Sequence, residues 1–102
     1  MKLSNTENVK KWVAALRSGK YKQAQFAMHK SDGSHCCLGV ARELMEDKSD
    51  ADAYGAVARW LGIPNEGDLI SYGGLDKFVQ LNDHFNQSFA HIADYVEDEC
   101  LE

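Results

Sequence analysis

The apolar residues of this 102-residue chain recur mainly at intervals of three and four, in short runs separated by glycine or polar turns. This spacing places them on one face of a helix and predicts a small, mainly helical protein. The clearest stripe, near the N-terminus, consists of Val9, Trp12, Val13 and Leu16. A second stripe, near the C-terminus, consists of Phe89, Ile92, Ala93 and Val96.

The pattern predicts five short helices. We expect the first to begin at a capping box formed by Ser4 and Glu7 and to end at Gly19. A second helix is predicted from about Cys37 to Asp47 and a third from about Ala53 to Leu61, followed by Gly62 and Pro64. Residues 65–74 are expected to form a loop with a brief extended piece at 69–70. The fourth helix is predicted from Leu75 to about Asp83, and the fifth follows a Ser88 cap.

The segment from Tyr21 to Cys37 lacks a helical period and is interpreted as a hairpin or an extended loop. Phe26 and Met28 alternate with small or polar neighbours, as in a short strand. Gly33 is expected to take a positive φ in the turn at residues 31–34. The predicted fold class is therefore α+β, mainly helical, with about five short helices and one small hairpin. We expect a single compact domain over residues 1–102. Its core is predicted to contain Trp12, Val13, Leu16, Leu38, Leu44, Trp60, Phe78, Phe89 and Ile92.

Charge divides the chain into two parts. Residues 1–30 hold seven basic residues and one acid, whereas residues 31–102 hold four basic residues and fifteen acids, and the net charge is −5. A field of this shape orients a partner but implies no chemistry. Because the overall charge opposes phosphate contact, direct binding of nucleic acid is not expected.

Composition limits where the chain acts. No apolar run approaches the roughly 18 residues of a membrane span, and the first residues lack the apolar stretch of a signal peptide. We therefore expect a cytoplasmic protein without a membrane partner. The three cysteines, Cys36, Cys37 and Cys100, fit free buried thiols in a reducing compartment.

Ligand-type residues gather only at His29, His35, Cys36 and Cys37. Adjacent cysteines in an extended segment point to opposite sides, which does not suit a tetrahedral zinc site. His35 and Cys36 are also neighbours that face opposite ways in a strand, which does not suit a cysteine–histidine nucleophile. The sequence thus predicts no metal, no cofactor and no catalytic residue, and it favours a binding protein over an enzyme.

Two surfaces are candidates for binding. The helix end near the C-terminus holds only acids among its charged residues, although the negative pole of a helix disfavours them. A basic partner surface would remove this repulsion, so the predicted partner-binding residues are Asp94, Glu97, Asp98, Glu99 and Glu102. Polar residues after the first helix and at the end of the fourth could line a small ligand pocket. These are Tyr21, Gln23, Gln25, Cys36, Asn82 and Asp83.

Several blocks of the sequence resemble a family of small uncharacterised proteins of bacteriophages and prophages. The resemblance covers about residues 9–97 and rests on the Cys-Cys-Leu-Gly-Val run at 36–40 and on Leu-Asn-Asp at 81–83 with Ser-Phe-x-x-Ile-Ala at 88–93. It implies a mobile element, the cytoplasm of a bacterial host and an accessory role, and it assigns no catalytic residue. The chain departs from the pattern at residues 26–28, where a glycine is expected after Gln25, and in a longer link before Ser88.

Two hypotheses follow. In the first, the chain is an accessory protein that binds a host protein, such as a counter-defence inhibitor. In the second, it binds or sequesters a nucleotide-like small molecule, or is a small enzyme. A homodimer is compatible with both hypotheses.

Overall fold

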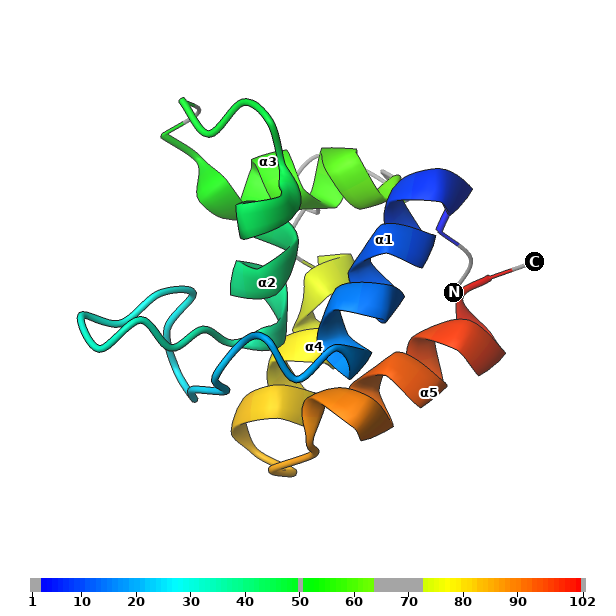
Figure 1. Ribbon diagram of the computed structural model, residues 1–102. Coiled ribbons are helices and arrows are strands. Elements are labelled where there is room, and N and C mark those ends of the chain that lie inside the picture. The colour runs from blue at the N-terminus through cyan, green and yellow to red at the C-terminus, as the bar shows by residue number, and fades with distance from the viewer. Residues whose placement is uncertain (1–2, 50, 64–72, 102) are drawn as a thin grey trace.

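In the part of the chain that it describes, the computed structural model contains five helices (Figure 1). They are α1 (Thr6–Arg17), α2 (Cys37–Leu44), α3 (Ala53–Leu61), α4 (Gly73–Asp83) and α5 (Phe89–Glu99). The structure describes residues 3–49, 51–63 and 73–101, with only the backbone of residues 73–76. The predicted loop at 65–74 lies largely outside these residues, except that Gly73 and Gly74 already belong to α4.

The prediction of an α+β fold is wrong, because the described residues form helices and no strand. The expected hairpin is a long loop, residues 18–36, in which only Gln23 and His35 form a β-bridge. That bridge is parallel, whereas a hairpin pairs its strands antiparallel. Phe26, expected in a strand, has a φ of 66°, in the left-handed region. Phe26 therefore does not lie in a strand, and the fold of the described residues is all-α.

The helices share one core. α1 packs along α5 and against α2 and α3, while α2 also contacts α3 and α4 (Figure 1). Seven of the nine predicted core residues are buried, and the other two, Leu44 and Trp60, are half-buried against the same cluster. The core also buries all three cysteines, as expected for free thiols.

The capping box predicted at Ser4 is wrong. The N-cap of α1 is Asn5, and its side chain makes no capping hydrogen bond to α1. Instead, Ser4 Oγ donates to the carbonyl oxygen of Gly62, and Asn5 Nδ2 donates to the carbonyls of Arg59 and Trp60. These side chains satisfy carbonyls that the end of α3 leaves without helical partners. The start of α1 is thus joined to the end of α3.

The other helix ends follow the sequence more closely. Gly62 ends α3 with a φ of 76°, and Ser88 Oγ accepts the His91 N–H at the start of α5, as predicted. α2 ends at Leu44, three residues before the expected Asp47. Gly33 has the predicted positive φ of 85° in its turn. Among the described residues, none of the helices combines the length and the hydrophobicity that a membrane span requires.

Candidate functional site

The described surface has a groove between α1 and α5. Its volume is about 470 Å³, and it is lined by Lys10, Val13, Ala14, Arg17, Glu97 and Leu101. Val13 is buried at the floor, Ala14 is exposed and Leu101 is half-buried. The groove therefore combines an apolar floor with a rim of both charges.

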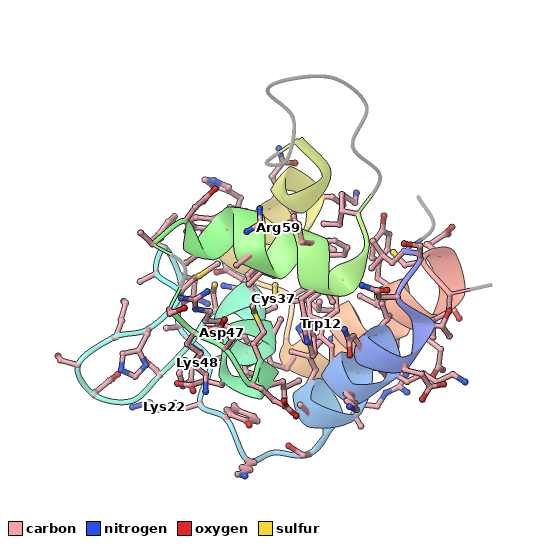
Figure 2. The ribbon with its side chains drawn as sticks, turned by 90° about the horizontal axis from the view of Figure 1, so that it is seen from above. Trp12, Lys22, Cys37, Asp47, Lys48 and Arg59 are labelled. Carbon is pink, nitrogen blue, oxygen red and sulfur yellow. The ribbon has the colours of Figure 1, made fainter. Side chains whose placement is uncertain are left out.

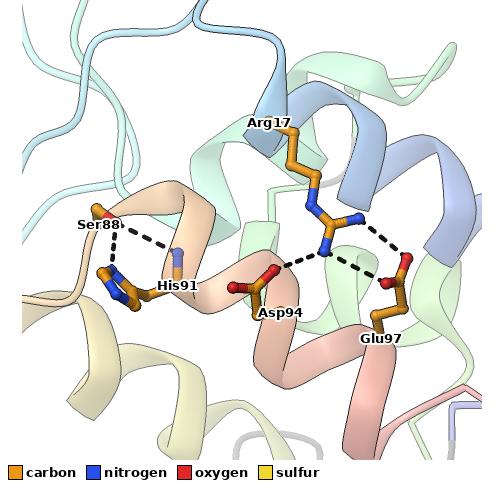
Figure 3. Close-up of polar contacts among 5 residues, drawn as sticks. All are labelled: Arg17, Ser88, His91, Asp94 and Glu97. Atoms are coloured by element: carbon orange, nitrogen blue, oxygen red, sulfur yellow. Dashed lines mark hydrogen bonds and ion pairs between the residues drawn. The ribbon is translucent and has the colours of Figure 1, made fainter.

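Arg17 connects the two walls of this groove. Its Nη2 lies 2.7 Å from Asp94 Oδ1, and its Nη1 lies 2.9 Å from Glu97 Oε2 (Figure 3). Hydrogen bonds to Glu97 and then Asp94 raise the pKa of Arg17 well above its ordinary range. The three side chains are between 38 and 63% exposed, so water screens the pairs, which fix the geometry more than they stabilise the fold.

The structure thus gives two of the five predicted partner-binding acids an internal partner. Arg17 neutralises Asp94 and Glu97 in place of an external cation. Asp98 and Glu99 are exposed on the same helix. Glu102 lies outside the described residues.

The residues predicted to line a ligand pocket are brought together in part. Gln23, Asn82 and Asp83 form one hydrogen-bonded network, which joins the 18–36 loop to the end of α4. Asn82 is fully buried, and its Oδ1 accepts from Gln23 Nε2 and from the Cys37 N–H. Its Nδ2 donates to the Ala24 carbonyl and to Asp83 Oδ1. All four hydrogen-bonding positions of the amide are therefore occupied by the protein itself.

Asp83 and Gln23 each have a further internal contact. Asp83 Oδ1 accepts the N–H of Phe26, and Gln23 Nε2 also donates to the carbonyl of Gln87. Gln25 is half-buried on the loop, and the half-buried Tyr21 places its ring edge-on to His35, with centroids 5.9 Å apart. The network thus holds the loop against α4.

The adjacent cysteines are packed as small apolar residues. Cys36 is the N-cap residue of α2, and Cys37 Sγ lies 3.6 Å from the carbonyl oxygen of Phe78. Burial raises the pKa of both thiols, and that of Cys37 most. Since the thiolate is the nucleophilic and metal-binding form, neutral buried thiols do not favour chemistry at this position.

The sequence pattern did not indicate Glu43, which the fold brings to His29 and His35. One ligand atom from each of the three residues lies within 4.8 Å of the others. His35 is buried, whereas His29 and Glu43 are exposed. Glu43 follows His35 by eight residues and lies on α2, so only the helix and the returning loop together create this cluster.

Comparison with family models matches residues 4–59 to a domain of unknown function, DUF8296. The chain belongs to the DUF8296 family. The DUF8296 segment holds α1, the 18–36 loop, α2 and most of α3, and therefore Arg17 and the cluster of His29, His35 and Glu43. The acids of α5 follow it. No curated protein and no solved structure matches the chain.

Proposed function

We propose that this protein acts by binding another protein through the groove between α1 and α5. The observation that carries the proposal is an apolar floor of Val13, Ala14 and Leu101 beside an acidic helix face. Burying apolar side chains drives protein association, and charges at the rim select the partner. The groove provides both an apolar floor and a charged rim.

The charges of the groove indicate the chemistry of the partner. Arg17 is already paired with Asp94 and Glu97, so its positive charge is largely neutralised within the protein. Asp98 and Glu99 extend an exposed negative surface toward the end of α5. A segment with an apolar side chain flanked by Lys or Arg complements this arrangement.

We further propose that this partner is a protein of a bacterial host. This part rests only on the resemblance to bacteriophage and prophage proteins. The ligand-pocket hypothesis has less support, because the side chains of Gln23, Asn82 and Asp83 form hydrogen bonds with one another and with the backbone.

The contact is tested with a photo-crosslinking amino acid at Ala14, on the groove, and in a second protein at Ser31, on the tip of the 18–36 loop. Both positions are exposed. In host lysate, the Ala14 probe should form a discrete crosslink that the Ser31 probe does not form. Equal crosslinking from both positions would contradict the proposal, and crosslinking of two copies of this chain would make the groove a homodimer surface.

The charge is tested with the identified partner. Asp98→Lys with Glu99→Lys should weaken binding by about tenfold or more at low salt and flatten its salt dependence, because screened charges contribute on-rate and specificity. Glu7→Lys with Glu46→Lys changes the net charge equally at exposed positions outside the groove. Equal effects of the two double variants would show that net charge, and not this surface, governs binding.

A further inference from the structure

We propose that His29, His35 and Glu43 form a binding site for a divalent transition metal ion of the class of Zn²⁺. The proposal is independent of the groove between α1 and α5. It rests on the atoms that the three side chains direct toward one another and on the backbone that holds them there.

The buried His35 is held in the form that a metal ligand requires. Its Nδ1 lies 3.1 Å from the carbonyl oxygen of Met28. A carbonyl only accepts, so Nδ1 carries the proton and Nε2 keeps a free lone pair. Histidines that bind metals typically donate their second ring nitrogen to a backbone carbonyl or a carboxylate in this way.

The free nitrogen of His35 faces the carboxylate of Glu43. Nε2 and Oε1 are 3.9 Å apart, which is too long for a hydrogen bond. Two ligand atoms that share one zinc ion at about 2.1 Å each lie roughly 3.4 Å apart at a tetrahedral angle. A shift of about half an ångström in the exposed Glu43 side chain therefore brings both atoms into range of one ion.

His29 supplies the third ligand from the loop. Its ring lies beside that of His35, with centroids 4.8 Å apart, and one of its nitrogens lies within 4.8 Å of a ligand atom of His35 and of Glu43. Its Nδ1 lies 3.4 Å from His35 Nδ1, so the exposed His29 ring has to turn from this contact toward Nε2 of His35 to bind the same ion. Since His29 and Glu43 are both exposed, an ion can reach the site from solvent. Two imidazoles and one carboxylate are a known zinc ligand set, and it leaves a coordination position open for water or another ligand.

Backbone packing fixes the distance between the loop and α2. Gly39 lies under the loop, and a Cβ atom there would overlap the carbonyl oxygen of Met28. The Cys36 N–H donates to the Ala27 carbonyl at 3.1 Å, so the loop is tied to the start of the same helix. These contacts hold Met28, whose carbonyl orients His35, and the next residue, His29, against α2.

Lys48 distinguishes this site from a simple ion pair. Its Nζ lies 3.6 Å from Glu43 Oε2, and both side chains are partly exposed. Figure 2 shows Lys48 near the end of α2. A metal ion at Glu43 would compete with this ammonium group. Removing the ammonium group should therefore strengthen metal binding. If Glu43 only forms an ion pair with Lys48, removing that group would leave the carboxylate unpaired and would not change the affinity for metal.

The experiment is calorimetric titration of chelator-treated full-length protein with Zn²⁺, with Co²⁺ absorption as a probe of the ligands. We expect one ion per chain. Both His29→Ala and Glu43→Gln should weaken Zn²⁺ binding by at least about tenfold. These residues are exposed, so the variants should fold, which circular dichroism checks. His84→Ala, at an exposed histidine outside the cluster, is the matched control and should leave the affinity unchanged.

Lys48→Met completes the set and should bind Zn²⁺ more tightly than the unaltered protein. The proposal is overturned if the unaltered protein binds no zinc, or if His29→Ala and Glu43→Gln bind it as tightly as His84→Ala. An affinity of Lys48→Met that is unchanged or weaker would contradict the competition that the geometry requires.

Discussion

The indole Nε1 of Trp12 donates a 2.8 Å hydrogen bond to the carbonyl oxygen of Cys37 inside the core. Figure 2 shows the two residues where α1 meets α2. The ring of Trp12 also meets Phe78 of α4 edge-on, with centroids 5.2 Å apart. One side chain thus joins three helices through a specific polar bond and an aromatic contact.

Trp12→Ala should lower the free energy of unfolding by about 3–5 kcal/mol, most of the stability of a domain of this size. Trp12→Phe keeps much of the apolar contact and loses volume and the hydrogen bond, so its cost should be smaller, about 1–3 kcal/mol. Urea unfolding measures both. An unchanged stability of Trp12→Ala would contradict the assignment of Trp12 to the core.

Asn82→Ala should also destabilise the protein, although it removes few apolar atoms. It leaves the Cys37 N–H and the Ala24 carbonyl without the Asn82 side chain, and it removes one of the two acceptors of Gln23 Nε2. Unsatisfied buried groups cost about 1–3 kcal/mol each before relaxation. We expect a loss of about 2–4 kcal/mol. Gln25→Ala, on the 18–36 loop, should cost much less. Equal losses of stability in the two variants would contradict the central place of Asn82 in the hydrogen-bond network.

The sequence predicted those parts of the fold that depend on neighbouring residues. The helical stripes follow from the spacing of apolar residues, and the end of α3 at Gly62 and the start of α5 at Ser88 follow from the chemistry of one residue each. The capping box failed because Ser4 hydrogen-bonds to Gly62, 58 residues away, which no local pattern indicates.

The candidate sites were predicted less well for the same reason. Ion pairs between Arg17 and two acids of α5 join residues 77 and 80 positions apart. Glu43 was not predicted because it stands eight residues after His35 and forms no ligand motif with the neighbouring cysteines and histidines. Asn82 was predicted to line a ligand pocket, yet the sequence next to a loop does not show that the side chain is buried.

Phe26→Gly should leave stability unchanged or raise it by up to about 1 kcal/mol. A bulky residue in the left-handed region costs about 1–2 kcal/mol, and glycine relieves this strain at an entropic cost of about 0.5–1 kcal/mol. The Phe26 side chain is 71% exposed, so little packing is lost. The control is Phe85→Gly: Phe85 is 60% exposed and lacks a positive φ, and this variant should lose stability. Thermal unfolding that shows equal losses would contradict the strain at Phe26.

Cys37 should make the protein sensitive to alkaline pH. Burial raises the pKa of its thiol well above the ordinary value of 9.0, so the folded protein keeps a proton that the unfolded chain releases. Above about pH 9 the unfolded state therefore binds fewer protons than the folded state, and the free energy of unfolding falls as pH rises. Below that pH both states hold the proton, and the thiol contributes no pH dependence.

The slope from one such thiol approaches about 1.4 kcal/mol per pH unit between the two pKa values. Lysines and tyrosines titrate in the same range, so the measurement is the difference between the unaltered protein and Cys37→Ala. Urea unfolding at pH 8, 9 and 10 in the presence of a reductant should give a shallower decline for Cys37→Ala. Parallel curves for the two proteins would mean that the Cys37 thiol titrates alike in the folded and unfolded states, and would contradict its deep burial.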